Sequence, residues 1–142
     1  MKTYNNQGNW KNGILYIGKH LVKATPNLIS KYIAKNGTKT IADNAFDPSH
    51  VRYEAIVLPE SLCRIGDYNF QKSNYLRLLH IPENVKYIGK YSFNNCVNLK
   101  AVILPENISK IGDYAFGDCK AISICAYEGT YAETFVKSQK YD

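Results

Sequence analysis

The chain has 142 residues, of which 45% are hydrophobic and 21% charged, a composition that supports one folded domain and excludes wholesale disorder. Its formal net charge of +6 is unevenly placed, because residues 1–42 hold seven lysines and no acid, whereas residues 43–142 hold 11 bases and 12 acids. No apolar run reaches the roughly 18–20 residues of a membrane span, and the first residues lack the apolar core of a signal peptide.

Residues 1–40 are predicted to form a basic N-terminal cap. Two apolar stretches, residues 14–17 and 20–22, flank Gly18-Lys19, and glycine at the first central position predicts a β-hairpin with a type II′ turn. Trp10 precedes this hairpin and is expected to cover the first coil of the array that follows. Residues 27–35 fit either a short helix or a degenerate strand.

An internal repeat of 23 residues occupies the middle of the chain. An Ile-Gly-x-Tyr-x-Phe motif begins at Ile65, Ile88 and Ile111, and a degenerate copy begins at Ile41, where Ala42 replaces the glycine. A Pro-Glu pair after a short apolar run returns with the same period. This period is too short for a helix-turn-helix unit and suits one coil of a leucine-rich or β-solenoid repeat, whose coils must stack to bury a core.

Stacked coils would align equivalent residues in columns. The isoleucines of the motif, and the phenylalanines Phe46, Phe70, Phe93 and Phe116, are predicted to form two buried columns. The glycines mark a tight corner where a side chain would clash or φ must be positive. Each coil contains a short strand that ends at a proline. Its inward positions are Val102 and Leu104 in one coil, and the same spacing predicts the inward pairs Ile56 and Leu58, Leu79 and Ile81, and Cys125 and Tyr127.

Residues 126–142 are predicted to close the array with a short amphipathic helix. Tyr131 and Phe135 are four residues apart and share one face. Thr130 is a plausible N-cap, because Glu133 follows three residues later as in a capping box.

Residues 81–99 read I-P-x-x-V-x-x-I-G-x-x-x-F-x-x-C-x-x-L, a pattern that resembles the leucine-rich repeat of BspA-like proteins, which are found on bacterial and some protozoan surfaces. The resemblance covers roughly residues 40–125. It implies a mainly β, right-handed solenoid of about four coils in a single domain, with an N-terminal hairpin cap (1–40), the repeats (41–125) and a helical cap (126–142).

The outward strand positions form the candidate partner-binding face. Most of them are apolar, although a solvated sheet face normally alternates to polar residues. The predicted face comprises Ala55, Val57, Leu78, His80, Ala101, Ile103 and Ile124, with Ala126 at its end and the charged residues Arg77 and Lys100 beside it. A second candidate is a column of tyrosines at the opposite corner, which suits either structural stacking or recognition: Tyr68, Tyr91 and Tyr114.

The remaining reactive residues favour no catalytic, metal or cofactor site. Cys96 and Cys119 share one repeat position, so a disulfide is sterically allowed, but two buried thiols are favoured. Cys125 is predicted to lie in the core and Cys63 to be exposed. The three histidines are far apart, and the repeated glutamates after the strands (Glu60, Glu83, Glu106) are read as turn chemistry.

These features predict a non-enzymatic protein-binding module without cofactors. The family resemblance implies a cell-surface or secreted adhesin-like protein that binds host extracellular or other proteins, with a leader removed; a native start at Met1 would place it in the cytoplasm. The alternative is a structural unit that self-associates through the apolar strand face. Nucleic-acid binding is disfavoured, because the basic cap has seven lysines, no arginine and few aromatics.

Overall fold

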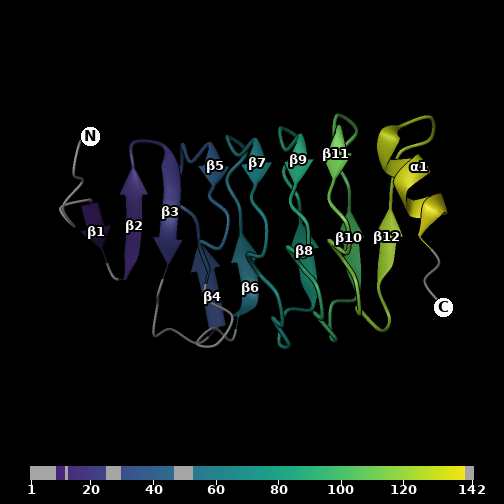
Figure 1. Ribbon diagram of the computed structural model, residues 1–142, viewed down its shortest axis with the longest axis horizontal. Coiled ribbons are helices and arrows are strands. Elements are labelled where there is room, and N and C mark those ends of the chain that lie inside the picture. Colours follow the sequence, from purple (N-terminus) through teal and green to yellow (C-terminus); the bar gives the residue numbers. More distant parts are fainter. Residues whose placement is uncertain (1–8, 12, 25–29, 47–52, 140–142) are drawn as a thin grey trace.

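The structure, a computed structural model, describes residues 9–11, 13–24, 30–46 and 53–139. Within these residues the chain winds into a mainly β solenoid of about four turns, and one short helix closes its C-terminal end (Figure 1). The coils stack side by side along the long axis of the molecule, as their shared 23-residue period predicts.

The strands fall into three sheets. The largest is ordered β1-β2-β3-β5-β7-β9-β11 and comprises β1 (Asn9–Lys11), β2 (Ile14–Ile17), β3 (His20–Ala24), β5 (Thr40–Ile41), β7 (Arg64–Ile65), β9 (Tyr87–Ile88) and β11 (Lys110–Ile111). The other two are ordered β4-β6 and β12-β10-β8 and comprise β4 (Ser30–Ile33), β6 (Tyr53–Val57), β8 (Leu78–His80), β10 (Ala101–Ile103) and β12 (Ser123–Cys125).

The predicted hairpin is present as β2 and β3, and Gly18 has the positive φ of +60° that the first central position of a type II′ turn requires. A third strand, β1, pairs antiparallel with β2 and places Trp10 opposite Leu15. Trp10 is therefore separated from β3 by a whole strand and is 43% exposed, so the prediction that it covers the first coil is wrong.

The repeat architecture extends to the N-terminal side of residue 41. Strand β3 pairs in parallel with β5 and places Leu21 beside Ile41, so Leu21 adds a member to the isoleucine column. Strand β4 pairs in parallel with β6, which decides residues 30–33 of the ambiguous segment in favour of a strand. The part of that segment before residue 30 lies outside the described residues.

Both predicted core columns are confirmed. The four isoleucines and the four phenylalanines are buried, and the rings of Phe70, Phe93 and Phe116 stack at centroid distances of 5.3 and 5.4 Å. The corner glycines are required by contact rather than by φ. A Cβ on Gly89 would lie 2.4 Å from the backbone nitrogen of Asp67, and the equivalent atom on Gly66 would meet the backbone of the preceding coil at 2.6 Å.

The final strand has a different register from the others. Ile124 pairs with Val102 and packs against the core, while Cys125 pairs with Ile103 and is exposed. The predictions that Ile124 faces outward and that Cys125 and Tyr127 (49% exposed) face inward are therefore wrong. A slip of one residue reverses the face of every side chain in a strand, and burying isoleucine removes more apolar surface from water than burying cysteine.

Ala126 follows the same slipped register. It packs against the core together with Ile122, so its predicted outward position is also wrong.

The C-terminal helix α1 (Tyr131–Ser138) caps the array as predicted. The Thr130 hydroxyl accepts the Glu133 backbone N–H at 3.2 Å, and the Glu133 carboxylate accepts the Gly129 backbone N–H at 2.9 Å. Phe135 is buried, and the Tyr131 hydroxyl accepts the backbone N–H of Ile111 at 3.2 Å, which ties the helix to the last isoleucine strand.

Candidate functional site

The candidate site is the outward surface of strands β4, β6, β8, β10 and β12, which we call the exposed sheet face. Two columns of side chains cross it, one residue from each strand. The strand pairings and the 23-residue period align Ile33, Val57, His80, Ile103 and Cys125 in one column, and Lys31, Ala55, Leu78, Ala101 and Ser123 in the other.

Large apolar side chains on this face are in contact with solvent. Leu78 is 68% exposed, Ile33 61%, Ile103 53% and Val57 42%, whereas the side chains that alternate with them, such as Leu79 and Val102, are buried. A single exposed aliphatic residue is ordinary, but four on neighbouring strands form a contiguous patch of the kind that marks interaction surfaces.

The two borders of the exposed sheet face carry opposite charge. Arg77 and Lys100 precede β8 and β10, and both are exposed. The other border, beyond the ends of β6, β8 and β10, carries the exposed carboxylates Glu60, Glu83 and Glu106. The prediction that the glutamates only serve turn chemistry leaves out this charge pattern.

Glu60 reaches toward the exposed sheet face, because its Oε1 lies 3.6 Å from Nε2 of His80. Both side chains are about two-thirds exposed, so the contact adds little stability. Its value is positional, since it shows that the acidic border lies against the apolar columns.

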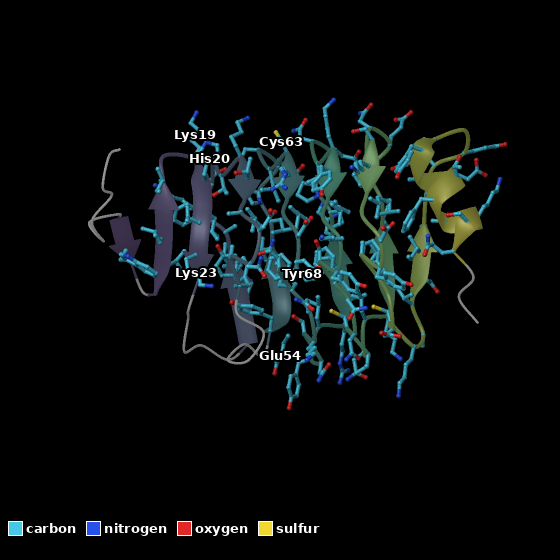
Figure 2. All side chains as sticks on the ribbon, in the orientation of Figure 1. Lys19, His20, Lys23, Glu54, Cys63 and Tyr68 are labelled. Carbon is cyan, nitrogen blue, oxygen red and sulfur yellow. The ribbon has the colours of Figure 1, made fainter. Side chains whose placement is uncertain are left out.

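A shallow pocket of about 280 Å³ lies at the basic border and is lined by Glu54, Tyr75, Arg77 and Asn98. Figure 2 shows Glu54 at the end of the coils opposite to Lys19, His20 and Cys63. The pocket is smaller than most sites for small molecules and is of a size to take a side chain of a bound protein.

Most of the sequence-predicted face is brought together by the structure. Ala55, Val57, Leu78, His80, Ala101 and Ile103 lie on it, with Arg77 and Lys100 at its border, whereas Ile124 does not. Sequence reasoning missed Ile33, because residues 27–35 were not assigned to a strand. It also missed Cys125, because the period was carried unchanged into the final coil.

The predicted tyrosine column is a continuous stack. The rings of Tyr68 and Tyr91 are 5.3 Å apart at an angle of 6°, and those of Tyr91 and Tyr114 are 5.2 Å apart at 16°. All three residues have φ between 54° and 56°, a left-handed conformation that is unfavourable for a bulky side chain. Each inner ring face is covered by the next ring, so the column is better suited to holding coils together than to receiving a ligand.

Next to the stack, polar side chains link successive coils. Asp43 Oδ1 accepts the backbone N–H of Asp67 at 2.9 Å and an Arg64 N–H at 3.1 Å, and the first of these hydrogen bonds lowers the pKa of Asp43 most. Asp67 Oδ1 in turn accepts the Tyr87 hydroxyl at 3.0 Å. Burial, followed by this hydrogen bond, raises the pKa of Tyr87.

All four cysteines are thiols. Cys96 and Cys119 are buried as predicted, and each donates to a phenylalanine carbonyl of the preceding coil at 3.3 Å. The hydrogen bond shared with Cys119, together with burial, raises the pKa of Cys96, so this thiol is a poor nucleophile. Cys63 is half-buried rather than the most exposed thiol, which is Cys125.

The described residues contain no cluster of three or more histidine, cysteine, aspartate or glutamate side chains placed to hold a metal ion. In the same part of the chain, no helix has the length and apolar character needed to span a bilayer.

Comparison with known proteins identifies the repeat. The family model for the BspA type leucine rich repeat region matches residues 3–124 in six copies. The chain belongs to this family. A search of curated proteins finds no match.

Two solved structures from bacteria are similar to this BspA-type repeat protein. The leucine-rich repeat protein of T. pallidum is 22% identical, with a TM-score of 0.61 over 74% of this chain and 62% of that one. A leucine-rich cell surface protein of Faecalibacterium prausnitzii A2-165 is 19% identical, with a TM-score of 0.49 over 91% of this chain and 40% of that one. The first likeness shows the leucine-rich repeat fold, and the chain spans less than two-thirds of either protein.

Proposed function

We propose that the chain is a non-enzymatic protein-interaction module whose partner docks on the exposed sheet face. The observation that carries the proposal is the exposure of Leu78, Ile103, Ile33 and Val57 on adjacent strands of an otherwise well-buried array. Covering these side chains would remove apolar surface from water, which is the main driving force of protein association.

The borders add what an interface needs besides apolar area. Charged side chains at the rim, here Arg77, Lys100 and the three glutamates, select and orient a partner, whereas the apolar centre supplies affinity. The pocket beside Arg77 can receive one side chain of that partner. Because the coils form one stacked array, the face presents these groups on a rigid scaffold.

BspA-type repeats in a cell-surface relative favour an extracellular setting, in which the module is displayed on or secreted from a cell and binds a protein of the host or of its own cell. The fold alone does not name the partner, since one scaffold hosts many binding surfaces.

The proposal is tested by placing a photo-crosslinking amino acid at Ile103, in the centre of the exposed sheet face, or at Tyr114, which is 62% exposed outside it. Each variant is irradiated alone and with a panel of extracellular-matrix proteins. We expect an adduct from position 103 and none from position 114, whether the captured protein is a matrix protein or a second copy. The absence of any adduct from position 103 would refute the assignment of this face.

A further inference from the structure

We propose that the exposed sheet face binds a second copy of this chain, in a dimer whose two-fold axis runs parallel to the solenoid axis. The inference rests on the proposed function and names the partner of the same surface. It is carried by the opposite charges at the two borders of the face.

The charge changes sign along the strands within a single coil. In the coil of β8, Arg77 precedes the strand and Glu83 follows it; in the coil of β10, Lys100 precedes and Glu106 follows. Leu78 and Ile103 lie between these charges and are the most exposed apolar side chains of the two coils. A partner for these coils must therefore be acidic at one border, apolar in the middle and basic at the other.

A second copy meets this requirement in one orientation. Rotation by 180° about an axis parallel to the solenoid reverses the strand direction and keeps the order of the coils. Arg77 then faces Glu83 of the other copy, and Lys100 faces Glu106 of the other copy. Rotation about an axis along the strands would keep the basic border on the basic border, so like charges would oppose each other.

The distances are suitable for these contacts. Two sheets that pack face to face are about 10 Å apart, which an arginine or lysine and a glutamate can bridge between them. The coil of β6 has acids at both borders, Glu54 and Glu60, so it disfavours this pairing. The contact is therefore centred on the coils of β8 and β10.

The experiment uses two complementary variants of the full chain and analytical ultracentrifugation from 5 to 500 µM. In R77E/K100E both borders are acidic, and in E83K/E106K both are basic. We expect wild type to dimerise, each variant alone to dimerise more than about tenfold more weakly, and an equimolar mixture to recover a heterodimer with wild-type affinity. High salt should weaken the wild-type dimer, because it screens the border charges.

Two further variants separate the face from the rest of the surface. Leu78→Glu should abolish dimerisation, and Tyr114→Glu, at an exposed position outside the face, should leave it unchanged. Circular dichroism checks that each variant is folded. A wild type that stays monomeric at 500 µM, a dimer that survives Leu78→Glu, or a mixture that remains monomeric would each overturn the dimer. A monomer that still crosslinks to a matrix protein from position 103 would overturn the dimer alone and leave the proposed function standing.

Discussion

Substitution of Gly89 by alanine gives the most direct measure of how closely the coils approach. The added Cβ would lie 2.4 Å from both the backbone nitrogen of Asp67 and the carbonyl carbon of Gly66, whereas ordinary contacts are 3.4–4 Å. The two coils would have to separate by about 1 Å, because the opposing atoms are backbone and cannot rotate away.

The expected cost combines overpacking with weakened hydrogen bonds. Overpacking a close contact costs about 1–3 kcal/mol. The separation also stretches the bond from Gly89 N–H to the Ile65 carbonyl, 2.8 Å, and the bond from Lys90 N–H to Asp67 Oδ1, 3.1 Å, each worth about 1 kcal/mol. We therefore expect Gly89→Ala to lower the free energy of unfolding by about 3–5 kcal/mol, a large part of the roughly 5–15 kcal/mol of a typical domain.

Urea unfolding followed by circular dichroism measures this loss, and Gly129→Ala is the matched control. Gly129 has φ +76° but no atom within 4 Å of the added Cβ, so its substitution costs only the backbone strain of about 1–2 kcal/mol. Ala42 occupies the equivalent corner beside the hairpin strand β3, where alanine is tolerated. Equal losses for Gly89→Ala and Gly129→Ala would refute the argument that contact, not φ, requires the corner glycines.

Three other predictions concern single groups. The Tyr53 hydroxyl is buried and has no hydrogen-bond partner among the described residues, so Tyr53→Phe should raise the urea midpoint by an amount equivalent to about 1 kcal/mol; a lower midpoint would mean that the hydroxyl is satisfied. The backbone N–H of the next coil lowers the pKa of Asp43, which adds stability above about pH 4 that is lost as the pH falls through the folded pKa; Asp43→Asn should flatten this acid-side decline in urea midpoints measured between pH 6 and 2.5, and an unchanged slope would contradict it. A thiol reagent should modify Cys125 rapidly in the folded chain but Cys96 and Cys119 only on unfolding, and mass spectrometry of digested samples would expose any early reaction of the buried pair.

The repeat and its core were determined by the sequence alone. Ile88, Phe93 and their equivalents recur at one spacing, and identical spacing in stacked coils can only produce continuous columns, so both columns are found buried. The same holds for the Gly18 turn and the Thr130 cap, which depend on local backbone chemistry within a few residues.

Only the tertiary structure decided the outer parts of the array. The final strand has no further coil to impose the 23-residue register, so burial of Ile124 in preference to Cys125 sets its register. Strand β4 lacks the repeat motif and exists through its pairing with β6, which adds Ile33 to the exposed sheet face. The charge reversal across that face likewise arises from stacking, because residues 23 apart become neighbours only once the coils are superposed.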